Sequence, residues 1–252
     1  MTLDWTGFSA LSIACLSIVK SYMSYNSTAP RVTGLFVVLA ALFVTLLITS
    51  NIIAVKLVLV WGRILPAAIV LFPITYVLGD VLTEVYGFRF ARRVIWLGFL
   101  CNAVAVVGFW IGGLLPSAPF WQEQDAYNTI LGYTPRLLMA SFAGYLVGEF
   151  SNSIILSRLK VATEGRWLWS RTISSTIVGQ GADSVVFITV AFVGTLAGSN
   201  LTELVITQWV VKVLYEVAAT PITYAVVGHV KAREGVDVYD HKISLNPLSF
   251  LR

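Results

Sequence analysis

The chain has 252 residues, of which 57% are hydrophobic and only 12% charged, and its net charge is +4. A soluble domain of this length needs more surface charge, so the composition indicates an integral membrane protein. Two cysteines and two histidines are too few for a disulfide framework or the usual zinc sites, so we expect no metal and no cofactor. The basic residues lie in short clusters between apolar segments, which favours topology signals over nucleic-acid binding.

The first apolar stretch, residues 8–19, is too short to cross a membrane and predicts a short interfacial helix. Six longer stretches follow, each long enough for a membrane-spanning helix of about 20 residues. They are residues 32–55, 64–88, 94–115, 137–157, 172–198 and 204–228. The expected fold is therefore an all-α polytopic protein with six transmembrane helices. Its parts are an N-terminal segment (1–31), a transmembrane domain (32–228) and a cytoplasmic tail (229–252).

The distribution of lysine and arginine predicts the orientation of the chain. With six spans, 13 of the 17 basic residues fall on one side of the membrane: Lys20, Arg31, Arg89, Arg92, Arg93, Arg158, Lys160, Arg166, Arg171, Lys231, Arg233, Lys242 and Arg252. The positive-inside rule places both termini in the cytoplasm, as an even number of spans requires.

A weak internal repeat accompanies this pattern. Tyr76-x-x-Gly79-Asp80 in the second span matches Tyr145-x-x-Gly148-Glu149 in the fourth, and PITY occurs at residues 73–76 and 221–224. Short matches in an apolar alphabet arise by chance about as readily as by duplication. If the repeat is genuine, three helical hairpins each carry one acid inward, as in many transporters.

Six ionisable residues lie within expected spans: Asp80, Glu84, Glu149, Asp183, Lys212 and Glu216. Each costs on the order of 2.5–3.5 kcal/mol at the centre of a membrane helix unless it faces a polar interior. Asp80 and Glu84 are four residues apart and point to nearly the same side of a helix. Two carboxylates so close in a low dielectric do not both ionise readily, so one should hold a proton.

Structural explanations compete with a binding role for these residues. Glu84 lies close enough to the cytoplasmic end to pair with Arg89 or Arg92, and Lys212 and Glu216 have the spacing to neutralise each other. Glu149 and Asp183 have amide neighbours that would fit a hydrogen-bonded network between helices. Recurrence in several spans favours a shared central cavity, lined also by amides and aromatic rings. These further candidates are Asn51, Tyr76, Asn152, Gln180 and Tyr215.

Four segments carry a resemblance to a known family. They are SNIIAVKLV (50–58), FPITYVLGDVLTEVYGFRFARRVIWLGF (72–99), GQGADSVVF (179–187) and KVLYEVAATPITY (212–224). Residues 32–228 resemble the queuosine precursor transporters of the YhhQ type, earlier grouped as vitamin-uptake transporters. GDxLTEVYG followed by a basic pair is the most specific part of this similarity.

The resemblance implies a bacterial inner-membrane carrier, not an enzyme, that imports 7-cyano-7-deazaguanine and also its aminomethyl relative. Such a base presents an N–H and an exocyclic amine side by side, which a carboxylate accepts as a pair. The hypothesis is that Asp80 and Glu84 bind this edge, that Asn51 or Gln180 meets an acceptor, and that an aromatic side chain holds the flat face. Either acid would also suit a coupled proton, and facilitated diffusion is equally compatible.

Two other classes compete with this interpretation. LGD (78–80) and GQGAD (179–183) faintly resemble the GxGD pattern of intramembrane aspartyl proteases, but neither has its spacing. A substrate-binding subunit of an ATP-driven vitamin importer fits the size, and the chain itself has no P-loop.

Small residues at Ala140, Ala143 and Gly144 would allow close helix packing, either within the chain or across a homodimer in the lipid.

Overall fold

The computed structural model describes residues 32–60, 63–132, 135–194, 198–241 and 244–248, and the interfacial helix expected at residues 8–19 lies outside them. The chain comprises two units, residues 1–33 and residues 34–252, and the helices and strands belong to the second. In chain order they are α2 (Gly34–Ile53), β1 (Leu57–Val60), β2 (Arg63–Pro66), the 3₁₀ helix η1 (Ala67–Val70), α3 (Phe72–Tyr86), α4 (Phe88–Leu114), α5 (Gln124–Leu131), α6 (Pro135–Ala162), α7 (Leu168–Phe192) and α8 (Gly198–Glu234).

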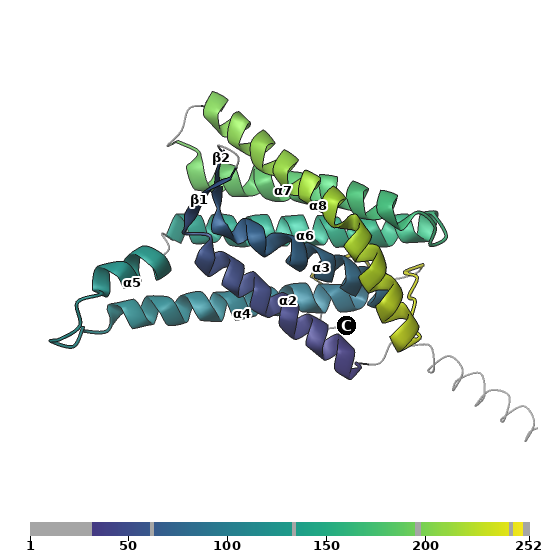
Figure 1. Ribbon diagram of the computed structural model, residues 1–252, viewed down its shortest axis with the longest axis horizontal. Coiled ribbons are helices and arrows are strands. Elements are labelled where there is room, and N and C mark those ends of the chain that lie inside the picture. Colours follow the sequence, from purple (N-terminus) through teal and green to yellow (C-terminus); the bar gives the residue numbers. More distant parts are fainter. Residues whose placement is uncertain (1–31, 61–62, 133–134, 195–197, 242–243, 249–252) are drawn as a thin grey trace, which may run out of the picture. The chain divides into compact units, whose positions relative to one another are not determined.

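Five of the expected spans coincide with long helices, α2, α4, α6, α7 and α8 (Figure 1). Within the described residues, α2, α4, α7 and residues 201–234 of α8 are long and apolar enough to cross a membrane. α6 has 28 residues but carries Glu149, Arg158 and Lys160 along its length. The chain is thus a helical protein that crosses the membrane several times, as its composition predicts, while the count of six stays a prediction.

The prediction that residues 64–88 form one continuous helix is wrong. Its first part forms β2 and η1, and only the 15 residues of α3 are α-helical. β1 and β2 pair as an antiparallel hairpin, so the chain is not entirely α-helical. Pro66 and Pro73 explain the shorter helix, because proline lacks an amide hydrogen and disfavours the helical conformation of the residue before it. At about 1.5 Å per residue, α3 is about 22 Å long and falls short of a membrane core about 30 Å thick.

α3 is the central helix of the bundle, in contact with α2, α4, α6 and α8. Val81, Leu82 and Val85 are almost fully buried and join Phe43 of α2 in the main apolar cluster. Polar residues on α3 therefore face protein rather than lipid, and this location removes much of the cost of placing charges there.

Glycines bring α6 and α7 into close contact. A Cβ atom on Gly148 would lie 2.7 Å from Cβ of Asp183, and one on Gly179 would lie 2.8 Å from Cβ of Asn152. Gly144 also faces α7, where a Cβ atom would lie 3.1 Å from Cβ of Phe187. The close packing expected at Gly144 thus occurs within the chain, between two helices whose polar residues it brings together.

Replacing Gly148 with alanine is expected to lower the thermal stability of the detergent-purified protein. The added methyl group overlaps Asp183 and forces α6 and α7 apart, a change that costs about 1–3 kcal/mol in well-packed cores. Gly108→Ala is the matched control, because nothing lies within 4 Å of a Cβ atom at Gly108 on α4. Thermal unfolding of both variants checks the prediction, and equal melting temperatures would contradict it.

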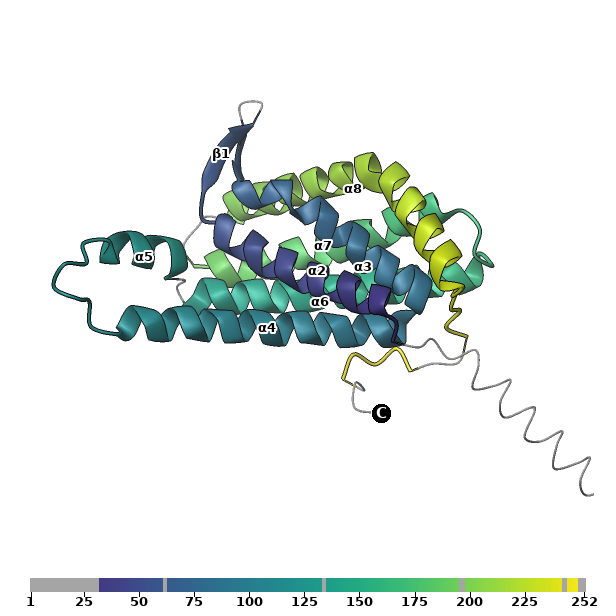
Figure 2. The ribbon, with the colours of Figure 1, turned by 60° about the horizontal axis from the view of Figure 1, so that its bottom comes forward.

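Basic residues gather at one end of the bundle. The α3–α4 and α6–α7 junctions and the carboxyl end of α8 lie at this end, whereas the β1–β2 hairpin and α5 lie at the other (Figures 1 and 2). Residues 235–241 and 244–248, which follow α8, run along the same basic end (Figure 2). The helix ends that the positive-inside rule assigns to one side of the membrane are therefore at one end of the structure.

Candidate functional site

Four acids from α3, α6, α7 and α8 form what we call the acid cluster: Asp80, Glu149, Asp183 and Glu216. Asp80 and Glu216 are each 1% exposed and Glu149 is 8% exposed. Asp80 interacts electrostatically with Glu216 and Glu149, and Glu149 does so with Asp183 and Glu216. The structure therefore brings together four of the acids that the sequence marked as binding candidates.

Two amides connect this cluster to the helices around it. Asn152 Nδ2 on α6 donates a hydrogen bond to Asp80 Oδ1 at 2.9 Å, and the Tyr76 hydroxyl on α3 donates to Gln180 Oε1 on α7 at 2.8 Å. Both amide side chains are buried. The Gln180 oxygen accepts the hydrogen bond from Tyr76. The Gln180 amino group is the donor of this amide.

Several carboxylate oxygens of the cluster lack a protein donor. Within the described residues, Asp80 Oδ2 and both carboxylate oxygens of Glu216 have no hydrogen-bond partner. A buried acceptor without a donor costs about 1–3 kcal/mol, and more when it is charged. Such oxygens are uncommon in folded proteins and mark a place where a proton or a donor-bearing molecule would be stabilised.

Lys212 forms an ion pair with Asp183 across the α7–α8 interface. The ammonium group of Lys212 donates to Asp183 on the neighbouring helix, and Glu216 along α8 accepts no hydrogen bond from it. Both side chains of the pair are about one-fifth exposed. Neither carboxylate oxygen of Glu216 accepts a hydrogen bond within the described residues.

Neutralising Lys212 alone is expected to lower the thermal stability of the protein more than neutralising both Lys212 and Asp183. Lys212→Met leaves the carboxylate of Asp183 without its cation, whereas Lys212→Met with Asp183→Asn removes the unpaired charge. We expect the double variant to recover most of the thermal stability that the single variant loses. A double variant less stable than Lys212→Met would contradict this assignment.

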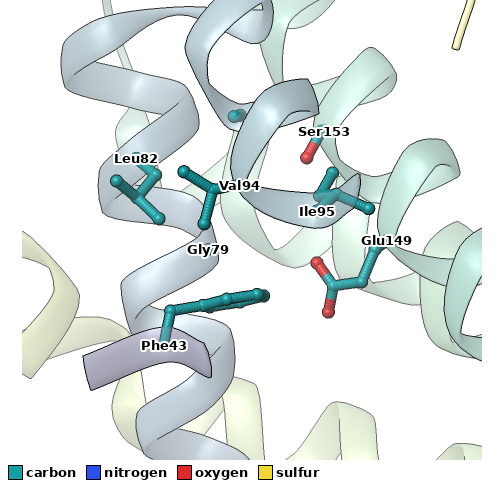
Figure 3. A pocket seen from close by; sticks show the side chains of 8 residues that line it. Phe43, Gly79, Leu82, Val94, Ile95, Glu149 and Ser153 are labelled. Carbon is teal, nitrogen blue, oxygen red and sulfur yellow. The ribbon is translucent and has the colours of Figure 1, made fainter. Parts of the chain in front are cut away.

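Glu149 points toward the contact between α2 and α3. Its carboxylate lies 3.4 Å from the position that a Cβ atom on Gly79 would take, and Phe43 lies beside it (Figure 3). The gap that these residues line with Leu82, Val94, Ile95 and Ser153 is too narrow for a water molecule. The structure is therefore closed around Glu149, and a bound solute at this point would require the helices to separate.

Glu84 has surroundings that differ from those of Asp80. Arg171 Nη1 lies 3.1 Å from Glu84 Oε2, Lys231 Nζ lies 2.9 Å from Glu84 Oε1, and Lys160 Nζ lies 3.6 Å from Glu84 Oε1. Lys160 also donates to the backbone carbonyl of Glu84. We call Glu84, Lys160, Arg171 and Lys231 the Glu84 network.

Sequence reasoning missed the three cations of this network. The expected partners of Glu84 were Arg89 and Arg92, but Arg92 donates instead to the carbonyls of Ser244 and Asn246. The sequence marked these cations, Lys160, Arg171 and Lys231, only as topology signals. No local spacing relates them to Glu84. The network supplies Glu84 with three cations, although its Oε2 accepts no hydrogen bond within the described residues. Glu84 thus has counter-ions within the protein, which Asp80 does not have in the described ion pairs.

The remaining candidates lie around the cluster or away from it. Asn51 on α2 donates to Asn102 Oδ1 on α4 at 3.0 Å. Tyr215 is 40% exposed on α8, because its neighbour Glu216 takes the inward-facing position. Among the described residues, no three His, Cys, Asp or Glu side chains are placed to hold a metal ion.

Apolar helices that can cross a membrane, packed around buried and incompletely satisfied polar groups, define a multi-pass helical membrane protein with a polar centre. Residues 66–226 match the family described as "Putative vitamin uptake transporter". The chain therefore belongs to this family of membrane transporters.

Two curated relatives agree with this assignment. One from Bacillus subtilis (strain 168), named "Probable queuosine precursor transporter", is 29% identical over 71% of this chain and 78% of its own. Another from Haemophilus influenzae, with the same name, is 27% identical over 48% of this chain and 49% of its own. No solved structure matches the chain.

Proposed function

We propose that this transporter carries a queuosine precursor of the 7-deazaguanine class, 7-cyano-7-deazaguanine and also its aminomethyl relative, into the bacterial cytoplasm. The names of the two relatives support the class of substrate. The observation that carries the proposal is the set of carboxylate oxygens on Asp80 and Glu216 that lack a donor within the described residues.

The chemistry of the base complements these oxygens. Its ring N–H and exocyclic amine are adjacent donors, and a carboxylate accepts both in a bidentate arrangement. The Gln180 amino group, oriented by Tyr76, suits the ring carbonyl, which is an acceptor. The additional negative charge at Glu149 and Asp183 favours the cationic aminomethyl form. In this arrangement Asp80 and Glu216 replace Asp80 and Glu84 as the pair that binds the donor edge.

The topology that we propose has six spans in the inner membrane and both termini in the cytoplasm. α3, extended by η1, would serve as the short second span. The basic helix ends support the cytoplasmic assignment of that end of the bundle. Three helical hairpins would then each contribute an acid of the cluster on their second helix, Asp80, Glu149 and Glu216.

Uptake of radiolabelled 7-cyano-7-deazaguanine by proteoliposomes that contain only this protein tests the proposal. We expect uptake without ATP and without another subunit, which an ATP-driven complex would need. Unlabelled 7-cyano-7-deazaguanine should compete, whereas the analogue without the exocyclic amine should compete at least ten-fold less well because one donor is lost. Uptake that is absent, or equal competition by both compounds, would refute the proposal.

A further inference from the structure

The Glu84 network lies between the acid cluster and the basic end of the bundle. Glu84 follows Asp80 by one helical turn on α3, and Thr83 Oγ1 contacts Ser153 Oγ on α6 at 3.1 Å between the two levels. Glu84, Lys160 and Arg171 are each no more than 2% exposed. A solute that leaves the cluster toward the basic end therefore meets a closed layer of ion pairs.

The segment after α8 covers this layer from outside. We call residues 235–241 and 244–248 the C-terminal strap. Asp240 Oδ2 accepts from the backbone amide of Phe88 at 2.8 Å and from Ser157 Oγ at 2.6 Å, and it thereby caps the first turn of α4. Further along, Trp96 Nε1 donates to the carbonyl of Pro247 at 2.9 Å. The strap is thus attached to α4 and α6 by polar contacts that can break and reform.

Two lysines connect the strap to the buried network. Lys231 Nζ lies 2.9 Å from Asp237 Oδ1 of the strap and also contacts Glu84, and Lys160 contacts the same two acids. Burial alone would raise the pKa of Asp237, but its hydrogen bonds with Lys160 and Lys231 hold that pKa below its ordinary value. Asp237 is therefore charged at neutral pH, and it holds the strap on the same two lysines that contact Glu84.

The strap is the part of this assembly best suited to open first. The Asp237 side chain is 42% exposed, so water competes for its ion pairs far more than for those of Glu84. Gly87, between α3 and α4, has a φ of 83° and leaves no room for a side chain beside Val238 of the strap. Because glycine has no side chain, the α3–α4 junction can pack directly against Val238 of the strap.

We propose that the C-terminal strap and the Glu84 network form a gate at the basic end of the bundle, which must open before a solute can pass between the acid cluster and that face. The strap is the outer part of this gate, and the buried ion pair of Glu84 with Arg171 is its inner part. This role requires only that the chain transports a solute and is independent of which solute is carried.

Cysteine labelling tests the gate without any substrate. Ser153 is 1% exposed and lies just inside the network, so Ser153→Cys in a chain with Cys15→Ser and Cys101→Ala reports access from the basic end. A membrane-impermeant maleimide is applied to that face of oriented vesicles. Asp237→Asn, and separately a stop codon after Glu234, should raise the labelling rate at least five-fold. Glu164→Gln is the matched control, since it neutralises an exposed acid at the same end and should leave the rate unchanged.

A second reporter separates opening of the gate from general loosening. Ser50→Cys, at a fully buried position on α2, should stay unlabelled in every one of these variants. Unchanged labelling at position 153 in Asp237→Asn would overturn the proposal. Labelling that rises equally at positions 50 and 153 would also overturn it, because the bundle as a whole would then have loosened.

Discussion

Glu216→Gln is expected to reduce uptake of the deazaguanine at least ten-fold while the protein accumulates normally in the membrane. A hydrogen bond to a charged group contributes about 1.5–3 kcal/mol, and each 1.4 kcal/mol is a factor of ten in affinity. The glutamine amide presents an amino group where the base also presents donors, so one contact becomes repulsive. Asp80→Asn should have a similar effect, because Oδ2 of Asp80 also lacks a donor within the described residues.

Stability measurements distinguish this loss from misfolding. Both carboxylate oxygens of Glu216 are buried without a donor in the described structure, so a neutral amide removes an unfavourable charge. We expect Glu216→Gln to melt at the same temperature as the parent protein or higher. Glu203→Gln, at an exposed position on the same helix, is the control and should transport normally. Normal uptake by Glu216→Gln would exclude this residue from the substrate site.

Glu84→Gln should have the opposite profile, with a large loss of stability. Removing this charge takes the carboxylate from the buried Arg171 and one of two acids from Lys160, and breaking a buried ion pair in this way costs about 3–5 kcal/mol. The variant should accumulate poorly and melt well below the parent protein in detergent.

Two comparisons make the assignment of Glu84 testable. Lys231→Met should be milder than Glu84→Gln, because the Lys231 side chain is 25% exposed and leaves Glu84 with two other cations. Glu164→Gln, which removes an exposed acid at the same end, should leave the melting temperature unchanged. A Glu84→Gln variant that is stable but inactive would instead place Glu84 in the substrate site.

Asp80 and Glu84 show that spacing along the sequence does not predict the partners of a buried acid. They lie four residues apart on one helix, and the sequence offered Glu84 only the nearby Arg89 and Arg92 as partners. Asp80 receives a hydrogen bond from Asn152, whereas Glu84 is held by cations contributed from three helix ends 76 to 147 residues away. No pattern within a window of the chain predicts such pairs, because they depend on which helices become neighbours.

Composition and hydropathy by themselves determined that the chain is a helical membrane protein, since a hydrocarbon solvent leaves few alternatives for long apolar segments. The sequence also identified the acids that form the cluster, because a charge within a membrane span requires a polar interior. Only the tertiary structure decided that Asp183 takes Lys212, that Glu84 belongs to an ion-pair network, and that residues after α8 cover it. Helix-to-helix contacts choose each partner, and proline placement shortened α3 where hydropathy alone predicted a continuous span.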